Sequence, residues 1–561
     1  MSIIEFLKAD KKRAGVIISI IILLIGVVPL IIFTFFADPV HPYTITQETL
    51  ISEDGTEIQA LIYAPLTASG NIPGVVLAHG YCGSKGSLHS IGIELVKRNF
   101  LVVNIDFRGH GASGGYLSRD PDGYEKLEMD VMAGVQYLKD SGVVDRIGLM
   151  GHSMGAGTVR RVAEKIPNQI NATISMGSIP SSVNTTLIPN LLVALGQFEQ
   201  AMVVNSALDF LELYTGQTGV AFDTLYGDFT DGNATKVALG PFSEHLYERT
   251  DPVIIYEIVN WFELTFYGSV RWEIVITSVF QNAFFYISIF GSVCLCFVVI
   301  IYLSKFIWKD KTMDIRKDLT KNTSIFLLLL YSIIIGLISL LSYLIFADLF
   351  VDVVTFSAGD QVFAFNFGFA MGVLIVYSLL VLRKERINFK DLPMKFKELT
   401  SNNATSSLIY GVLTAILLII GITSISFWSQ SPGWPTTREI GTIIGLTFIF
   451  FPLLFIKEFY FRTVQSKLNF SNRFKEYFSM VFIGIFLETV VTVPLALLTW
   501  GSANSMLSFI SLSLTATFIM TVIQQILVTW VYMHSGRNIV GSTVFLCILY
   551  SWIIINFFPF T

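Results

Sequence analysis

The sequence predicts a chain of two parts: an α/β domain on an eight-stranded, mostly parallel sheet, and an all-α membrane domain of about eight helices. Residues 40–265 carry charged residues and turn signals, whereas residues 275–561 are one long apolar run after another. In the first part, short apolar runs alternate with helical patterns, which is typical of a parallel sheet covered on both faces. Over the whole chain only 14% of residues are charged, against about 25% in typical soluble domains.

The N-terminal segment, residues 1–39, is expected to be a short cytoplasmic stub followed by a membrane anchor. The apolar run 16–36 has the length of about 20 residues that a spanning helix needs, and lysines precede it. The alternative is a cleaved signal peptide, whose apolar region would be about 7–15 residues long and would end at a small-residue cleavage site. The run here is longer and no such site follows it, so the sequence favours an uncleaved anchor.

The α/β domain is predicted to begin with a β-hairpin, because residues 44–51 and 57–63 alternate around the turn 52–55. Short apolar runs follow as candidate buried parallel strands. These runs are 74–78, 100–105, 146–150, 172–175, 191–195 and 236–239. Helical patterns lie between most of them, at 88–97, 124–139, 155–165 and 251–262. We therefore expect one sheet with helices on both faces.

The segment Gly151-His152-Ser153-Met154-Gly155 directly follows the strand at 146–150 and opens a helix. A G-x-S-x-G sequence in this context forms a sharp turn that presents the serine as a nucleophile, and its glycines leave room for the turn. A purely structural turn is the alternative. The position between a strand and a helix favours Ser153 as the nucleophile.

Two other turns follow predicted strands. The loop His79-Gly80-Tyr81-Cys82-Gly83 follows the strand at 74–78, and we interpret His79 as a structural residue that holds this loop. The turn Asp106-Phe107-Arg108-Gly109 follows the strand at 100–105. We interpret this turn as structural too, with Arg108 pairing locally and Asp106 as a cap.

Together these motifs resemble the α/β-hydrolase superfamily over residues 40–265, nearest its dienelactone-hydrolase-like and serine-aminopeptidase-like branches. The resemblance implies a catalytic triad in the chain order serine, acid, histidine. It also implies an oxyanion hole formed by the backbone N–H groups of Tyr81 and Met154, each worth about 3–4 kcal/mol.

Glu199 is the predicted acid of the triad. It ends the segment Gly196-Gln197-Phe198-Glu199 after the strand at 191–195, where the superfamily usually has G-x-x-D. Glutamate can orient the imidazole as aspartate does. Because the residue departs from the usual aspartate, three downstream aspartates remain alternatives: Asp223, Asp228 and Asp231.

His245 is the predicted base, because it is the only histidine after Ser153 within the domain. Its alternative is a histidine in a surface loop with no catalytic role. If the triad forms, His245 removes the proton of Ser153, the serine attacks a carbonyl carbon, and water resolves the acyl-enzyme. This chemistry requires no metal and no organic cofactor.

The sequence thus predicts a serine hydrolase of carboxylic esters, with a serine peptidase as the second choice. The expected substrates are small esters, lipids or peptides, and the expected partner is the lipid bilayer. A net charge of −5 and the lack of a basic stripe exclude a nucleic-acid partner. The alternatives are a transporter or flippase that carries a hydrolase-fold domain, and a non-catalytic sensor on that fold.

Apolar runs of spanning length follow the α/β domain. They lie at about 281–304, 323–347, 362–382, 406–428, 439–456, 477–500, 505–533 and 538–558. Lysines and arginines gather in alternate loops, around 305–321, 383–397 and 457–475. By the positive-inside rule these loops and the N-terminus are cytoplasmic. The predicted location is the cell membrane, with many spans and the α/β domain on the extracytoplasmic side.

The segment Lys457-Glu458-Phe459-Tyr460-Phe461-Arg462 resembles the EExxxR motif of CAAX-type intramembrane glutamic proteases. Lys457 stands in place of the first glutamate, and no histidine lies between His245 and His534. The resemblance therefore implies a degenerate relative that has lost that chemistry. Charges at the boundary of a helix explain the segment equally well. Glu488 is the main charge expected at the centre of a membrane helix, where charges mark function.

Overall fold

The computed structural model describes most of the chain. The described residues are 11–35, 41–66, 70–118, 123–180, 188–199, 201–308, 322–350, 356, 359–391, 394, 400, 403–429, 434–468, 470, 472–499 and 505–560. The chain forms two compact units. The sheet unit comprises Ile22–Ile289, Thr423–Trp434 and Asn556–Thr561, and the helical unit comprises Met1–Ile21, Phe290–Ile422 and Pro435–Ile555.

One eight-stranded sheet forms the centre of the sheet unit. Its strands are β1 (Tyr43–Ile51), β2 (Glu57–Pro65), β3 (Ile72–Ala78), β4 (Leu101–Ile105), β5 (Val144–His152), β6 (Ala172–Met176), β7 (Leu191–Gly196) and β8 (Thr235–Gly240). They lie in the order β1-β2-β4-β3-β5-β6-β7-β8. Strand β2 is antiparallel to β1 and β4, and the other neighbours are parallel. The predicted eight-stranded, mostly parallel sheet is confirmed.

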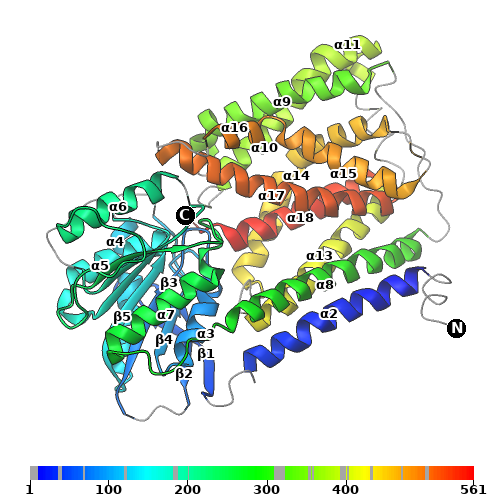
Figure 1. The fold of residues 1–561 in the computed structure, drawn as a ribbon. Coiled ribbons are helices and arrows are strands. Elements are labelled where there is room, and N and C mark those ends of the chain that lie inside the picture. The colour runs from blue at the N-terminus through cyan, green and yellow to red at the C-terminus, as the bar shows by residue number, and fades with distance from the viewer. Residues whose placement is uncertain are drawn as a thin grey trace. The chain divides into compact units, whose positions relative to one another are not determined.

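Helices cover both faces of this sheet (Figure 1). One core packs the sheet against α4 (Gly123–Asp140), α5 (Met154–Lys165) and α6 (Ala201–Thr215). The second core packs the opposite face against α3 (His89–Val96) and α7 (Pro252–Tyr267). Short 3₁₀ helices lie at η1 (Lys85–Leu88), η2 (Pro167–Gln169) and η3 (Glu248–Thr250). Every residue of β3, β4, β6 and β7 is buried, as expected for parallel strands covered on both faces.

The turn after β4 is structural, as predicted, but its arginine does not pair locally. The Arg108 guanidinium donates to the Asp130 carboxylate of α4 at 2.7 Å and to Asp54 of the β1–β2 turn at 2.5 Å. These partners are 22 and 54 residues away in sequence. Because β2 pairs with β4, the β1–β2 turn reaches the same end of the sheet as Arg108. The buried Asp106 accepts hydrogen bonds from Lys85, which lies at the start of η1.

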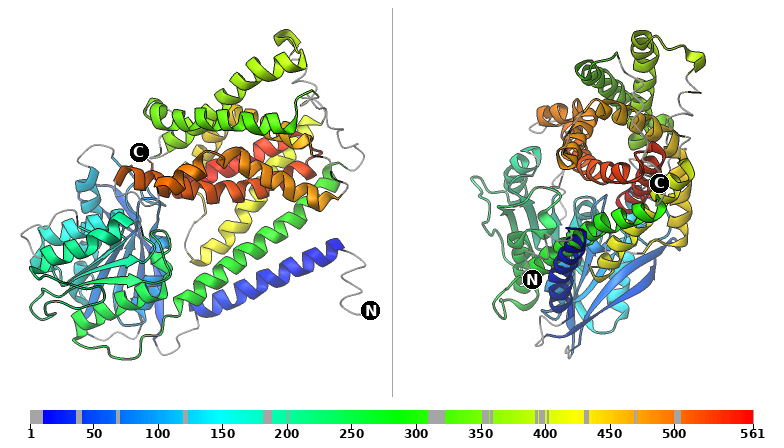
Figure 2. Two further views of the ribbon diagram at one scale, coloured as in Figure 1. Left: turned by 45° about the horizontal axis from the view of Figure 1, so that its top comes forward. Right: turned by 90° about the vertical axis from the view of Figure 1, so that its right-hand side faces the viewer.

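Most of the helical unit consists of long apolar helices (Figures 1 and 2). They and the short turns between them are α2 (Lys11–Phe35), α8 (Ser278–Ile307), α9 (Ile325–Phe346), η4 (Ala347–Phe350), α10 (Gly359–Val376), a π-helical turn (Tyr377–Val381), α11 (Leu382–Glu385), η6 (Phe389–Asp391), α13 (Ala404–Ser429), α14 (Thr437–Ser466), α15 (Arg473–Thr489), α16 (Thr492–Thr499), α17 (Ser505–His534) and α18 (Ile539–Phe557). Within the described residues, 8 helices are long and apolar enough to cross a membrane.

The run predicted at 477–500 is two helices rather than one straight span. Helices α15 and α16 meet at an angle of 58°, and counting them as one broken span gives 9 candidates. Pro494 lies in the first turn of α16. Proline lacks an N–H group, and its ring collides with the carbonyl four residues before it, so a continuous helix through Val490 is unfavourable. The proline therefore accounts for the break.

The charged segment 457–462 lies inside α14, not at the boundary of a helix. Lys457, Glu458 and Arg462 are all buried. The Lys457 ammonium pairs with the Glu488 carboxylate of α15, and the Arg462 guanidinium pairs with Glu458 one turn earlier at 2.8 Å. Opposite charges thus satisfy one another in the interior of the helical unit, as buried charges require.

Candidate active site

Ser153 occupies the sharp turn between β5 and α5. Its backbone has φ 52° and ψ −112°, an uncommon conformation for a residue with a side chain. The two glycines of the motif make the turn possible. A Cβ atom on Gly151 would lie 2.2 Å from the carbonyl carbon of Gly155, and one on Gly155 would lie 2.2 Å from the carbonyl oxygen of Ala78. The Ser153 N–H donates to the carbonyl of Met176 at 2.8 Å, which fixes the turn against β6.

The structure brings Ser153, His245 and Glu199 into one hydrogen-bonded chain. His245 Nε2 lies 2.9 Å from Ser153 Oγ, and His245 Nδ1 lies 2.7 Å from Glu199 Oε2. Glu199 follows β7 and His245 follows β8. Both residues therefore lie at the carboxyl ends of the parallel strands, where Ser153 follows β5. The Glu199 carboxylate is buried and the imidazole is nearly so, with 16% of its side chain exposed.

The three alternative aspartates lie in other surroundings. Asp223 accepts a hydrogen bond from the backbone N–H of Leu239 at 3.2 Å, beside β8. Asp228 caps the turn that begins at Thr230, and Asp231 is exposed. Glu199 is thus the residue that the structure places on the imidazole of His245.

His79 holds the loop after β3, as the sequence predicted. Its Nδ1–H donates to the carbonyl of Gly80 at 2.7 Å, and its Nε2 accepts from the N–H of Phe107 at 3.0 Å. These contacts require a neutral ring that carries its proton on Nδ1. Burial lowers the pKa of His79 to about 3, which keeps the ring neutral at physiological pH.

The predicted oxyanion donors lie on the two segments that flank the serine. Met154 is the first residue of α5, where backbone N–H groups have no acceptor within the helix. The loop that carries Tyr81 lies against the turn, since a Cβ atom on Gly80 would be 3.3 Å from Ser153 Cβ. His110 Nε2 lies 2.8 Å from the Tyr81 carbonyl oxygen, so its N–H can donate to that group and hold it in place.

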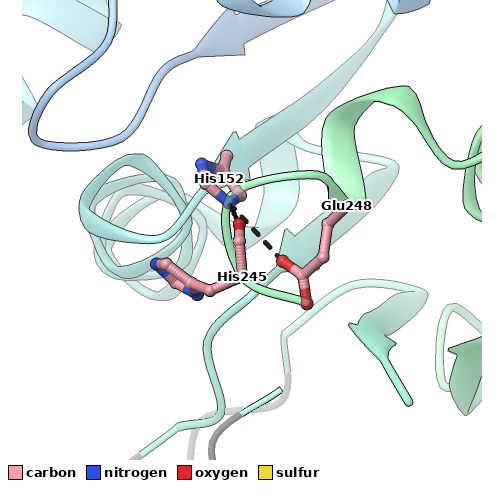
Figure 3. Close-up of side chains that lie close together, drawn as sticks. All are labelled: His152, His245 and Glu248. Atoms are coloured by element: carbon pink, nitrogen blue, oxygen red, sulfur yellow. Dashed lines mark hydrogen bonds and ion pairs between the residues drawn. The ribbon is translucent and has the colours of Figure 1, made fainter. Parts of the chain in front are cut away.

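Two residues that the sequence analysis did not assign to the site lie behind it. His152 Nε2 lies 3.0 Å from the carbonyl oxygen of His245 and 3.4 Å from Glu248 Oε2 (Figure 3). Burial holds the pKa of His152 well below its usual value and raises the pKa of Glu248 well above its usual value. Burial thus favours the neutral form of both side chains. The position of His152 beside the serine was an available signal, whereas nothing in the sequence marks Glu248.

The ligand atoms of His152, His245 and Glu248 lie within 4.8 Å of one another, a spacing that could hold a metal ion. Both ring nitrogens of His245 already form hydrogen bonds, to Ser153 and to Glu199. A metal ion on His245 would therefore have to replace one of the two contacts of the chain.

Large aromatic side chains are exposed on the loops that carry Glu199 and His245. Phe198 is 58% exposed, Phe242 76% and Tyr247 54%. Phe198 directly precedes Glu199, and the other two flank His245 in sequence. The loops that carry Glu199 and His245 thus expose apolar surface.

Part of the sheet unit is similar in sequence to known proteins. The model of the family described as "Serine aminopeptidase, S33" matches residues 72–223. A monoacylglycerol lipase of Mycolicibacterium smegmatis is 30% identical over 135 residues, which cover 24% of this chain and 47% of the lipase. The sn-1-specific diacylglycerol lipase ABHD11 of Xenopus tropicalis is 31% identical over 142 residues, or 25% of this chain and 42% of the lipase. The chain thus spans less than half the length of these relatives.

Solved structures of esterases are similar to the same part. Est1E from Butyrivibrio proteoclasticus, bound to ferulic acid, aligns with 40% of this chain and 100% of its own at 18% identity, with a TM-score of 0.32. The esterase Pf2001 of Pyrococcus furiosus aligns with 39% of this chain and 92% of its own at 19% identity, with a TM-score of 0.31.

The family match covers residues 72–223 alone, so the resemblance of 457–462 to CAAX-type proteases stays a prediction. The eight-stranded sheet and the matched family agree with each other. The sheet unit therefore contains an α/β-hydrolase domain of the serine aminopeptidase S33 type.

Proposed function

We propose that this chain is a membrane-anchored serine hydrolase that cleaves lipid esters through Ser153, His245 and Glu199. The observation that carries the proposal is the continuous chain of hydrogen bonds, 2.9 Å from serine to imidazole and 2.7 Å from imidazole to carboxylate. This arrangement couples a nucleophile to a base and the base to a group that orients it.

In the proposed mechanism His245 Nε2 takes the hydroxyl proton of Ser153 as Oγ attacks the ester carbonyl carbon. The N–H groups of Tyr81 and Met154 stabilise the oxygen that becomes negative. The imidazolium then gives its proton to the departing alcohol, which leaves an acyl-serine. Water attacks this ester by the reverse sequence and releases the fatty acid. Glu199 stays ionised and stabilises the imidazolium.

Apolar surface and the helices favour a lipid ester as the substrate. The aromatic rim of Phe198, Phe242 and Tyr247 would contact an acyl chain. Helices of spanning length would keep the site near a bilayer that supplies such esters. The lipases among the relatives are named for acylglycerols. We place the N-terminus in the cytoplasm and the hydrolase domain outside it, following the basic loops.

Hydrolysis by the purified full chain tests this proposal. We expect turnover of a long-chain monoacylglycerol, none by Ser153→Ala, and little turnover of an aminoacyl anilide. Phe242→Ser should lower kcat/KM for the long-chain ester about tenfold while sparing an acetyl ester, because a buried phenyl ring contributes about 1.5–3 kcal/mol. The matched control is Leu213→Ser on α6, a side chain 71% exposed.

Faster turnover of the anilide would contradict the lipid assignment and favour a serine peptidase. Turnover of neither substrate by folded protein would favour the transporter or the sensor instead.

A further inference from the structure

The segment that follows α18 belongs to the sheet unit, although α18 itself lies almost wholly in the helical unit. We call residues 558–560 of this segment the C-terminal strap. The Phe560 N–H donates to the Gly109 carbonyl at 2.8 Å, and the Phe560 carbonyl accepts from the Leu117 N–H at 2.7 Å. Phe560 thus bridges two points of the loop that follows β4.

The loop leaves room for the strap at Gly109. This glycine has φ 73°, and a Cβ atom on it would lie 2.6 Å from the Phe560 carbonyl oxygen. A residue with a side chain at this position would be strained and would push the strap away from the loop. The loop also closes on itself here, because the Gly109 N–H donates to the Gly114 carbonyl at 2.9 Å. The Phe560 side chain is buried, so packing adds to the two backbone hydrogen bonds.

The same loop contacts the segment that carries Tyr81, the proposed oxyanion donor. His110, the residue after Gly109, places its Nε2 atom 2.8 Å from the Tyr81 carbonyl oxygen. Two residues before Gly109, the Phe107 N–H donates to His79 Nε2 at 3.0 Å. Residues on both sides of Gly109 therefore hold the segment after β3.

These contacts fix the direction of the Tyr81 N–H. The Gly80 carbonyl belongs to the same peptide group, and it accepts from His79 at 2.7 Å and from the Gly83 N–H at 2.9 Å. A peptide group is planar and almost always trans, so its C=O and N–H point in opposite directions. The Tyr81 N–H therefore points away from these two donors. Its direction depends on where the loop after β4 holds His79 and His110.

We propose that Phe560 is a positioning residue for the oxyanion hole: the C-terminal strap holds Gly109, and His110 beside it holds Tyr81. The inference rests on the proposed function, because the strap acts on the reaction only through the proposed oxyanion donor. Loss of the strap would move this donor away from the charge that develops in the transition state, which lowers kcat more than it changes substrate binding. The strap continues directly from α18, so the chain itself links a helix of spanning length to the active site.

Removal of the strap tests this inference on the purified chain with a water-soluble acetyl ester. Deletion of residues 558–561 should lower kcat about 10- to 100-fold with little change in KM, because a displaced donor loses part of the stabilisation that an oxyanion donor supplies. Phe560→Pro lacks the N–H that donates to Gly109 and should lower kcat in the same direction. Phe560→Leu is the conservative variant. It keeps both backbone hydrogen bonds and an apolar side chain, so it should restore most of kcat.

A double-mutant cycle tests the route through His110. His110→Ala alone should lower kcat, as the deletion does. In the His110→Ala background the deletion should lower kcat by no more than about twofold further, because two changes in one chain of contacts are not additive. An equal effect of the deletion with and without His110 would overturn the proposal, as would an unchanged kcat in the folded deletion variant.

Hydrogen exchange measured by mass spectrometry tests the contact without any activity. Peptides that cover residues 79–85 should exchange faster in the deletion variant and in Phe560→Pro than in the wild type, whereas peptides from β6 should not change. If the wild type hydrolyses no ester but this difference is present, the proposed function fails while the positioning contact stands. Equal exchange of residues 79–85 in all three proteins would overturn the proposal.

Discussion

Burial lowers the pKa of four histidines of the sheet unit and so favours their neutral form. Burial lowers the pKa of His79 to about 3 and that of His89 to about 4, and it lowers the pKa values of His110 and His152 as well. The histidines of the unfolded chain have pKa values near 6.5, so below this pH they bind protons that the folded chain does not bind. The folded state is therefore fully stabilised above pH 6.5 and loses stability as the pH falls below it.

We predict a steep loss of stability between pH 6.5 and pH 4. Each of these histidines should remove up to about 1.4 kcal/mol per pH unit until its folded pKa is reached. The measurement is the unfolding midpoint of the purified chain as a function of pH. His89→Gln, which removes one titrating ring, should flatten the dependence. An unfolding midpoint that stays constant from pH 7 to pH 5 would show that the rings are protonated in the folded state.

Several residues of the site could be predicted from the sequence, because their positions follow from local rules. Ser153 lies in a motif between a strand and a helix that the sequence pattern predicts. His245 and Glu199 follow from the serine, acid, histidine order of the triad and from their positions after predicted strands. Glu248 could not be predicted. Its contact with the backbone N–H of Gly196 depends on the paired ends of β7 and β8, and a glutamate in a loop has no local pattern.

At the scale of elements, one carboxylate of α3 caps the start of α8. Glu94 Oε1 accepts from the backbone N–H groups of Thr277 at 2.8 Å and of Ser278 at 2.6 Å. The first N–H groups of a helix have no acceptor within it, and a negative charge there is favourable. Lys97 of the sheet unit donates to the Thr277 hydroxyl and pairs with Glu94 at 3.6 Å. The hydrolase domain thus fixes where α8 begins.

We predict that Glu94→Leu loosens the start of α8, because it leaves two N–H groups without an acceptor at a cost of about 1–3 kcal/mol each. Hydrogen exchange measured by mass spectrometry should speed up in peptides that cover residues 277–282. Glu94→Gln retains a carbonyl acceptor and serves as the matched control, with exchange close to that of the wild type. Equal exchange in Glu94→Leu and wild type would mean that other contacts hold this turn.

The elements themselves could be predicted to different degrees. Each predicted strand corresponds to an observed strand, because buried parallel strands read as short apolar runs between turn signals. The break between α15 and α16 was not predicted, because the apolar run continues through it. Pro494 was the signal in the sequence that could have indicated it. The burial of Lys457 was also missed, because α14 continues beyond the apolar run to Ser466.

On the scale of the whole molecule, composition alone divides the chain into an α/β part and an apolar helical part. Apolar length identifies the candidate spans, because a bilayer sets a minimum length for a helix. Sidedness depends on the lysines and arginines of the loops instead, since these residues stay on the cytoplasmic side.

We predict that the β1–β2 turn faces the outside of the cell. In a Cys82→Ser background, Glu53→Cys places a thiol on this exposed turn. A maleimide that cannot cross membranes should label this thiol on intact cells. Labelling that requires lysis would reverse the orientation proposed for the hydrolase domain. The parent Cys82→Ser protein, which lacks the thiol at position 53, serves as the control.

The most direct measurement of the central claim is labelling of the purified chain with a fluorophosphonate, which reacts with an activated serine. We predict one adduct, mapped to Ser153 by mass spectrometry, that is lost in Ser153→Ala and His245→Ala. Glu199→Gln should slow labelling strongly, whereas Asp223→Asn should label at the wild-type rate. A folded wild-type chain that remains unlabelled, or that labels equally fast without His245, would contradict the account.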